Sequence, residues 1–129
     1  MLQQTYQLTE EAITMLGVSA EESRAEQPGQ WNLKKGSFDI MIDVWEEQGQ
    51  VLFQVICPLC TLPDENKEGF YLFLLERNHQ LSAVTYTVFE GNVYLKHTRE
   101  ANGLTKEEIV NLLSKTAYYA EQSEFVPAD

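Results

Sequence analysis

The chain has 129 residues, of which 43% are hydrophobic and 22% are charged, and its formal net charge is −11. This length has room for one core, and the composition is that of a folded protein rather than a disordered one. We therefore expect a single domain over residues 1–129. A surface this acidic repels phosphate groups, which excludes nucleic acid and anionic lipid as expected partners.

The expected location of the protein follows from two absences in the sequence. There is no run of about 18 apolar residues, so we expect no membrane span. The first residues, Met1 to Tyr6, lack the basic and apolar stretches of a secretory signal. We therefore expect a cytoplasmic protein.

The first predicted element is a helix near the N-terminus. Leu8, Thr9 and Ile13 have the spacing of a hydrophobic staple, which introduces many helices. Gly17 follows Leu16 and suits the left-handed residue with which helices often end. We expect the helix to end at this pair.

From Trp31 to Pro58, glycine-containing turns separate short β-rich runs, which predicts a three-stranded antiparallel meander. The side chains of these runs alternate, so one face of the sheet is apolar and is predicted to be core. The core residues are Phe38, Ile40, Ile42 and Val44 in one run and Val51, Phe53, Val55 and Cys57 in the next.

The opposite face of this meander is mixed. Met41, Trp45 and Ile56 lie on it beside charged and amide side chains. Aromatic and methionine side chains on a partly polar face are typical of binding surfaces, so these three residues are candidates for contact with a partner. The alternative is that a helix of the same chain covers this face.

A helix is predicted from Glu65 to His79. Residues 70–75 are apolar without interruption, and Asp64 with Glu65 suits the positive end of the helix dipole. Such a helix has more than one face to bury, one of them against the sheet. The other face needs either the terminal helices or a second molecule. In the second case the expected contact residues are Phe70, Tyr71, Phe73, Leu74 and Arg77.

The last elements are a hairpin and a helix. Residues 83–89 and 92–97 flank the turn at Glu90-Gly91 and predict two further strands. Thr105 and Glu108 then have the spacing of a capping box, which predicts a helix that runs to about Ser123. The predicted order is therefore helix, three strands, helix, two strands, helix.

Cys57 and Cys60 have the spacing of a thiol redox pair and lie between a predicted strand and a predicted helix. However, residues 61–63 separate them from the helix N-terminus whose dipole would lower a thiol pKa, and acidic neighbours raise that pKa. We therefore favour two partly buried thiols, with a redox protein as the remote alternative.

Other catalytic or metal chemistry finds little support. Cys57 and Cys60 could bind zinc with His79 and His97, but these histidines lie far along the chain on different predicted elements. The sequence has no phosphate-binding glycine loop, nucleophile elbow or helical His pair, and no carboxylate in an apolar stretch that would raise its pKa. We expect no enzymatic activity, no metal and no other cofactor.

Several short segments at the ends of the predicted elements carry a resemblance to a known family. They are Trp31-Asn32-Leu33 with Gly36-Ser37, Cys57-Pro58-Leu59, Leu62-Pro63, Leu74-Leu75-Glu76-Arg77-Asn78, residues 90–95 and Gly103-Leu104-Thr105. With these segments the sequence resembles the YbjN-like family, whose fold is that of the class I type III secretion chaperones.

The resemblance implies an α+β fold with a strongly twisted, five-stranded antiparallel sheet and three helices in the order αβββαββα. It also implies a dimer in which the middle helix takes part, and a chaperone-like role in holding an extended segment of a client. We therefore hypothesise a non-enzymatic protein-binding module that acts as a homodimer on an unknown client protein. A small-ligand-sensing or regulatory module is the alternative.

Overall fold

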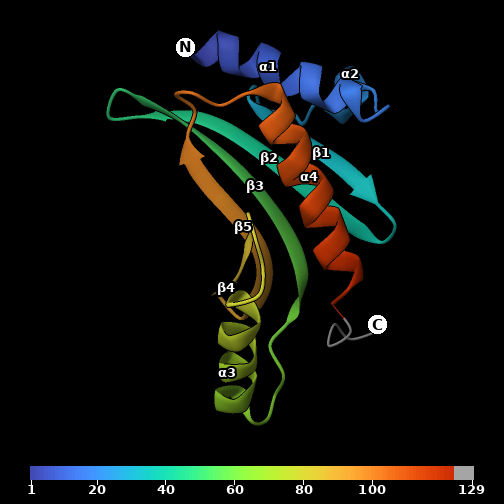
Figure 1. The fold of residues 1–129 in the computed structure, drawn as a ribbon, viewed down its shortest axis with the longest axis vertical. Helices are drawn as coiled ribbons and strands as arrows, with labels where there is room; N and C mark the ends of the chain where they lie inside the picture. Colours follow the sequence, from blue (N-terminus) through green and yellow to red (C-terminus); the bar gives the residue numbers. More distant parts are fainter. Residues whose placement is uncertain (124–129) are drawn as a thin grey trace.

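The computed structural model describes residues 1–123 and is an α+β fold (Figure 1). In chain order its elements are α1 (Leu2–Met15), α2 (Ala20–Ser23), β1 (Gln30–Lys35), β2 (Phe38–Glu47), β3 (Gln50–Thr61), α3 (Lys67–Asn78), β4 (Thr85–Phe89), β5 (Asn92–Glu100) and α4 (Lys106–Glu121). The strands form one antiparallel sheet in the order β1-β2-β3-β5-β4. The predicted sheet and element order are confirmed, with the short helix α2 in addition. None of the helices in residues 1–123 is long and apolar enough to cross a membrane.

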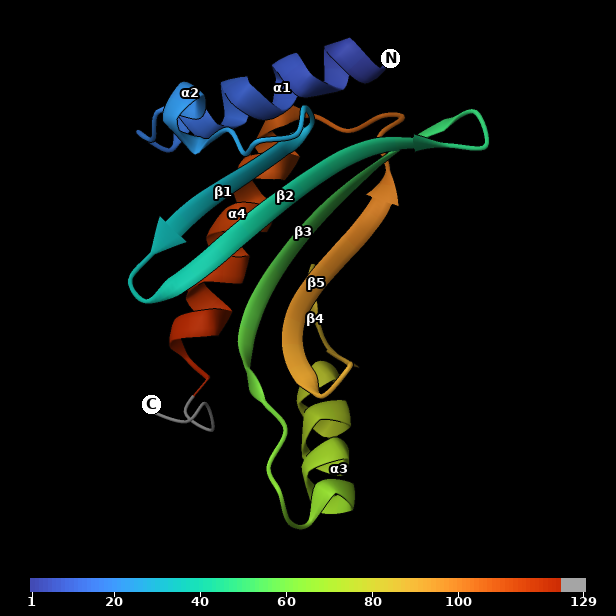
Figure 2. The ribbon, with the colours of Figure 1, turned by 180° about the vertical axis from the view of Figure 1, so that it is seen from behind.

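Helices α1 and α4 pack on the same face of the sheet. Figure 1 shows α4 lying across the strands and α1 across one end of them, whereas the view from behind in Figure 2 shows the other face without a described helix over it. The covered face carries the alternating apolar side chains that were predicted to be core. Its fully buried residues include Ile42, Phe53, Val55 and Cys57 of the sheet, with Ile13 and Ile109 of the two helices.

Helix α1 begins at Leu2, so the staple predicted around Thr9 is wrong. Thr9 lies inside the helix and is fully buried, where its Oγ1 donates to the carbonyl oxygen of Thr5 at 2.8 Å. Two threonines occupy inward positions of α1 and interrupt its apolar periodicity. This interruption explains why the sequence pattern predicted the start of α1 too late. The predicted end is confirmed, with Gly17 at φ 80°. The buried residues of α1 are Thr5, Thr9, Ala12 and Ile13.

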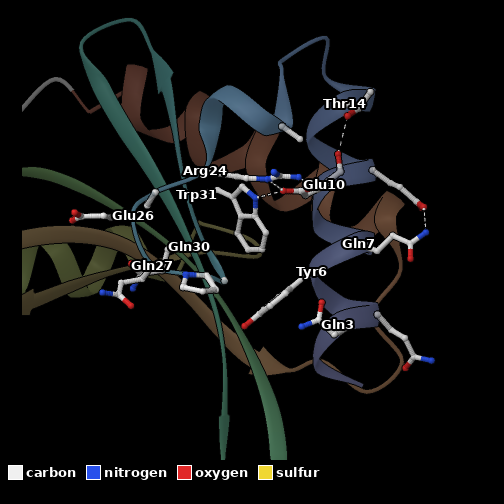
Figure 3. A pocket seen from close by; sticks show the side chains of 16 residues that line it. Gln3, Tyr6, Gln7, Glu10, Thr14, Arg24, Glu26, Gln27, Gln30 and Trp31 are labelled. Atoms are coloured by element: carbon white, nitrogen blue, oxygen red, sulfur yellow. Dashed lines mark hydrogen bonds and ion pairs between the residues drawn. The ribbon is translucent and has the colours of Figure 1, made fainter.

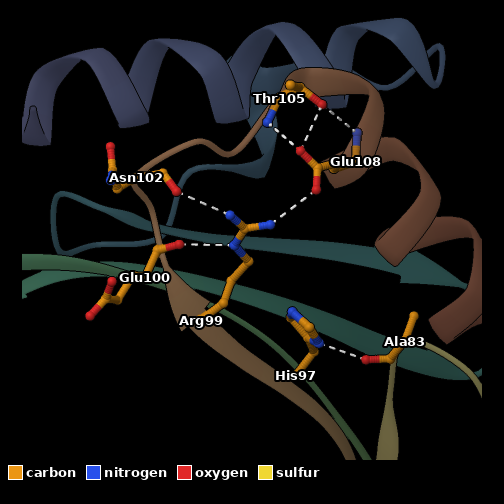
Figure 4. A network of polar contacts seen from close by, with 7 residues as sticks. All are labelled: Ala83, His97, Arg99, Glu100, Asn102, Thr105 and Glu108. Carbon is orange, nitrogen blue, oxygen red and sulfur yellow. Dashed lines mark hydrogen bonds and ion pairs between the residues drawn. The ribbon is translucent and has the colours of Figure 1, made fainter.

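Helix α4 begins with the predicted capping box. Thr105 Oγ1 accepts a hydrogen bond from the Glu108 N–H at 3.1 Å, and Glu108 Oε1 accepts one from the Thr105 N–H at 3.0 Å. The bonds that the Thr105 N–H and Oγ1 donate to the Glu108 carboxylate hold its pKa below the ordinary value. Arg99 of β5 pairs with Glu108 at 3.0 Å and donates to the carbonyl oxygen of Asn102, which ties the end of β5 to the start of α4 (Figure 4).

Three strands and the middle helix differ from prediction at their ends. Strand β5 continues to Glu100, past the predicted end at His97. Strand β3 continues past Pro58 to Thr61, because its pairing with β5 resumes after a register shift between Pro58 and Cys60. Strand β4 starts at Thr85 rather than Ala83, whose φ of 73° is left-handed. Helix α3 starts at Lys67, after Asn66 at φ 55°, so the acidic pair at 64–65 lies before the helix.

Gly29 provides the sharpest test of how α1 and the sheet are joined. Its φ is 81°, and a Cβ built there would lie 2.6 Å from the Val44 carbonyl oxygen and 2.9 Å from Cε1 of Tyr6. Gly36 has a similar φ of 63° but nothing within 4 Å of such a Cβ. We expect Gly36→Ala to lower the free energy of unfolding by about 1 kcal/mol, for backbone strain alone. Gly29→Ala adds the steric clash and should cost about 2 kcal/mol more.

Urea denaturation of the two variants beside the wild type measures this difference. Equal losses of stability would show that the close approach of Tyr6 and Val44 to Gly29 does not constrain the fold.

Candidate functional site

Helix α3 presents apolar side chains to solvent. Leu72 and Leu75 are 57% and 67% exposed, and Tyr71 and Phe73 are each 38% exposed. Leu74 is the buried residue of this helix, so it faces the chain's own core and offers no surface to a partner. Figure 1 shows α1 and α4 lying on the sheet, away from α3. They therefore do not cover these exposed side chains. One alternative for the apolar surplus of α3, coverage by the terminal helices, is therefore wrong for the described residues.

The aromatic part of this surface is held in place by its neighbours. Phe70 packs, partly buried, against the core, and its ring stacks on Phe73 with 6.4 Å between the centroids. The guanidinium of Arg77 lies 5.7 Å from the centroid of the Phe73 ring, within cation–π range. Phe70 and Arg77 thus border the exposed apolar face and fix the orientation of Phe73.

Helix α3 stands at the end of the sheet and contacts the rest of the chain mainly through β4 (Figure 2). Asn78, its last residue, joins the two elements. The Asn78 Oδ1 accepts a hydrogen bond from the Tyr86 N–H at 2.6 Å, and its Nδ2 donates to the Tyr86 carbonyl oxygen at 3.1 Å. The side-chain amide of Asn78 therefore occupies the backbone of the edge strand as a neighbouring strand would.

The loop between α3 and β4 is fixed independently. Lys115 Nζ donates to Ser82 Oγ at 2.6 Å, and the Ser82 N–H donates to the Tyr119 hydroxyl at 3.2 Å. Hydrogen bonds from the Ser82 side chain and backbone lower the pKa of Tyr119 below its ordinary value. On the other side of the loop, Nδ1 of His97 lies 2.6 Å from the carbonyl oxygen of Ala83 (Figure 4).

The mixed face of the sheet is open. Met41, Trp45 and Ile56 are partly exposed there, as predicted for a face of mixed character, and no helix of residues 1–123 packs on them. Thr98 donates to Gln54 at 2.8 Å and Gln54 to Asp43 at 3.4 Å, which forms a polar row across three strands. Register places Met41 directly opposite Ile56 on one side of this row and Trp45 opposite Leu52 on the other. The sequence left open that a helix of the same chain covers this face. Within residues 1–123, that alternative is wrong.

Strand β1 forms one edge of the sheet. In an antiparallel ladder, residues alternate between those that bond the partner strand and those whose backbone groups point away. The two-residue turn after Lys35 makes Lys35, Leu33 and Trp31 the bonding residues. The N–H and C=O groups of Asn32 and Lys34 therefore point outward from the edge. The start of this edge is already occupied: Arg24 forms an antiparallel bridge with Trp31, and the Gln30 carbonyl oxygen accepts a hydrogen bond from the Ala25 N–H at 2.9 Å. The outward groups of Lys34 lie beyond this bridge.

An apolar groove of about 360 Å³ runs beside this edge, between β1, α4 and the segment after α1. Lys34 and Lys35 border it, and the side chain of Lys34 is 78% exposed although it pairs with Asp39. The border is basic on the side of β1, whereas Glu121 of α4 lines the groove on the other side. Sequence patterns gave no signal for the groove, because its residues come from four separate segments. Its apolar residues are Leu16, Val18, Leu33, Ile40, Leu113, Ala117 and Tyr118.

A larger cleft of about 950 Å³ lies between α1 and the segment before β1 (Figure 3). Glu10 crosses its floor, where it accepts two hydrogen bonds from Arg24, at 2.6 and 2.8 Å, and one from Trp31 Nε1 at 2.9 Å. The bond from Arg24 is the main reason that the pKa of Glu10 is lowered. Tyr6 packs edge-on against Trp31, and glutamine side chains form much of the rim.

The two cysteines are unsuited to thiol exchange. Both lie in β3 rather than at a helix N-terminus. Burial raises the pKa of the Cys57 thiol to about 12, and the negative charge of Asp39 adds to the shift. A neutral, buried thiol is a poor nucleophile, which argues against the redox alternative. Within residues 1–123 no three Cys, His, Asp or Glu side chains come together as metal ligands, and the proposed zinc set is not assembled.

The predicted contact residues thus fall into two separate groups. Those of α3 form one exposed face at the end of the sheet, from which Leu74 is excluded by burial. Met41, Trp45 and Ile56 lie together on the open sheet face. The groove beside β1 and the cleft beside α1 were not predicted, because both depend on the way distant segments pack.

Family and sequence comparisons identify the relatives of the chain. The model of the YbjN family, described as "putative bacterial sensory transduction regulator", matches residues 7–124. An uncharacterised protein of Mycobacterium leprae is 40% identical over 58 residues, which are 44% of this chain and 32% of that protein. An uncharacterised protein of Mycobacterium tuberculosis is 32% identical over 91 residues, which are 70% of this chain and 46% of that protein. The chain thus spans less than half the length of these curated relatives.

Three solved structures of protein complexes contain chains with the same fold. A chain of the ExsC–ExsE complex aligns with a TM-score of 0.69 at 18% identity, over 99% of this chain and 97% of that one. A chain of the HopA1–SchA chaperone–effector complex gives 0.67 at 10% identity, over 90% and 89%. A chain of the ExoU–SpcU complex from the type III secretion system of Pseudomonas aeruginosa gives 0.65 at 14% identity, over 92% and 97%. The predicted fold is confirmed by these likenesses.

The buried thiol leads to a prediction about reactivity. In a Cys60→Ser variant, the remaining Cys57 should react with a disulfide reagent at pH 8 about a hundredfold more slowly when folded than when unfolded in guanidinium. In the matched Cys57→Ser variant, the partly buried Cys60 should react faster than Cys57 does. Rapid reaction of Cys57 in the folded protein would contradict this account and restore the redox hypothesis.

Proposed function

The chain belongs to the YbjN family, and we propose that it is a non-enzymatic protein-binding module that dimerises through α3 and holds an extended segment of a client protein. The observation that carries the proposal is the exposed apolar face of α3, on a helix held to the domain mainly at β4. The fold likeness supports it, because the solved relatives come from chaperone–effector and related complexes.

The partner proposed for α3 is a second copy of the chain. Leu72 and Leu75 lie near the middle of the exposed face, so antiparallel packing of two α3 helices buries them against each other. Each end of the helix carries both charges, with Lys67 and Glu68 at the start and Glu76 and Arg77 at the end. An antiparallel pair can therefore place opposite charges side by side at both ends, which suits a self-complementary interface.

The proposed site for the client is the open edge of β1 together with the groove beside it. Beyond the bridge between Arg24 and Trp31, the outward N–H and C=O groups of Lys34 can pair with an added strand. Alternate side chains of that strand would enter the apolar groove, and the others would lie beside Met41 on the open sheet face. The lysines at the edge favour a client segment that alternates apolar with acidic residues. Trp45 and Ile56 extend the same open face and are proposed as further contacts.

The cleft beside α1 favours a second candidate function, a small-ligand-sensing module. Its volume of about 950 Å³ suffices for a small molecule. The cleft ranks below the apolar surfaces because the charge of Glu10, its central carboxylate, is already matched by Arg24 and Trp31 within the chain. A ligand retained in the native mass spectrum of the purified protein would favour this function over protein binding.

We predict that the wild type sediments as a dimer at micromolar concentration and that Leu72→Glu or Leu75→Glu weakens the dimer at least about a hundredfold, because a charge replaces a buried apolar contact. Met15→Glu is the matched control, since Met15 is 53% exposed on α1, away from α3. Analytical ultracentrifugation of the four proteins measures the effect. A wild type that remains monomeric, or equal weakening by Met15→Glu, would refute the α3 dimer.

The client site is tested with proline on each edge of the sheet. Lys34→Pro removes an outward N–H of β1 without removing a ladder bond, and Val88→Pro does the same on β4. We predict that affinity purification from the native cell gives one dominant partner in fixed stoichiometry with the wild type and Val88→Pro, and that Lys34→Pro loses it. A partner retained by Lys34→Pro, or lost equally with both variants, would contradict binding at the β1 edge.

A further inference from the structure

Strand β4 forms the second edge of the sheet, and its outward backbone groups follow from its register. The two-residue turn after Phe89 makes Phe89, Thr87 and Thr85 the residues that bond β5. The N–H and C=O groups of Tyr86 and Val88 therefore point away from the sheet. Those of Tyr86 are occupied by Asn78, as described above, whereas no described residue bonds those of Val88.

The sequence of β4 is suited to pairing with itself. Residues 85–89 are Thr-Tyr-Thr-Val-Phe, without a charge, a glycine or a proline. Such β-branched and aromatic segments pair readily with further strands when their edge is exposed. Val88 is 40% and Phe89 64% exposed, so the segment already presents apolar surface. The chain as a whole is strongly acidic. Because β4 itself carries no charge, pairing of two β4 strands would not place like charges of these strands side by side.

Antiparallel pairing of β4 with β4 of a second copy requires the groups that Asn78 occupies. If the two strands meet about Thr87, Tyr86 of each copy exchanges hydrogen bonds with Val88 of the other. With Asn78 in place, Val88 alone is available, which leaves too few bonds for a paired edge. Asn78 and a second β4 therefore compete for the same backbone groups.

From this competition we infer that β4 is a latent self-association edge whose partner is β4 of a second copy, and that Asn78 keeps it closed. The second copy is the fitting occupant because the strand is neutral and the pairing is symmetric about its own centre. Asn78 acts as a positioning residue: by holding the backbone groups of Tyr86, it prevents two copies from continuing their sheets through β4. This inference goes beyond the proposed function and holds whether or not α3 dimerises.

The test replaces Asn78 with a side chain that fills similar space but cannot bond Tyr86. Asn78→Leu should leave the fold intact, because Ser82 and Ala83 still fix the loop to α4 and β5. We expect hydrogen exchange of the Tyr86 amide at low protein concentration to speed up at least about tenfold relative to the wild type. At high concentration we expect assemblies larger than the wild-type species in sedimentation velocity.

Val88→Pro in the Asn78→Leu background provides the decisive comparison. It removes an N–H that the paired edge needs but that the β4–β5 ladder does not use. The double variant should return to the wild-type assembly while the Tyr86 amide stays fast. If Asn78→Leu does not fold, Asn78→Ala serves in its place, since it removes both side-chain bonds to Tyr86 and adds no bulk. Unchanged Tyr86 exchange, no added assembly, or assembly that survives Val88→Pro would each overturn the inference.

Failure of this inference can be told apart from failure of the α3 dimer. The Tyr86 exchange rate is read at a concentration where the protein is monomeric, and the added assembly is read relative to whatever state the wild type has. Leu72→Glu removes the proposed α3 contact but leaves Asn78 and Tyr86 untouched. Asn78→Leu combined with Leu72→Glu should therefore still assemble through β4.

Discussion

Packing of α1 and α4 on one face of the sheet is the constraint on which the other features depend. The alternating side chains of β2 and β3 make that face apolar, and residues such as Phe53, Val55 and Ile109 are fully buried there. Burial of each such side chain contributes about 1.5–3 kcal/mol, so this layer supplies most of the stability. Because α1 and α4 both pack on this face, neither of them covers the opposite face of the sheet or the outward side of α3 (Figure 2).

The two edges of the sheet and the outward face of α3 differ in how far other parts of the chain cover them. Both sheet edges are partly closed from within, at β1 by the Ala25 N–H and at β4 by the Asn78 side chain. Beyond the bridge between Arg24 and Trp31, the remaining outward groups are those of Lys34 on β1 and of Val88 on β4. The open part of β1 lies next to an apolar groove, whereas β4 lies next to a helix with exposed apolar side chains. The proposed sites for strand addition and for helix packing are thus separate from each other.

Much of this fold could be predicted from local sequence signals. Period-2 alternation identified the buried face of β2 and β3, and the Thr105–Glu108 capping box located the start of α4. The start of α1 was missed because threonines occupy two inward positions, which weakens the apolar periodicity. The first turn of α3 was placed too early because its N-cap, Asn66, is left-handed and makes no side-chain capping bond that sequence spacing could reveal.

The candidate surfaces were predictable only in part. The excess of apolar residues in α3 was evident from its sequence, but the uninterrupted apolar run at residues 70–75 does not reveal which of its side chains faces inward, and Leu74 proved to be the buried one. The groove beside β1 and the cleft at Glu10 arise where segments far apart in the chain meet, so no spacing pattern encodes them. The role of Asn78 likewise depends on the register of β4 and on the position of α3, which only the folded chain supplies.

The central claim is that the outward face of α3 is buried by a second copy of the chain. Hydrogen exchange of the wild type, followed by mass spectrometry over a range of protein concentrations, tests it directly. The account predicts that amides of residues 67–78 gain protection as the concentration rises, while those of α4, whose core residues are already buried, stay constant. Exchange in α3 that does not depend on concentration would contradict the claim.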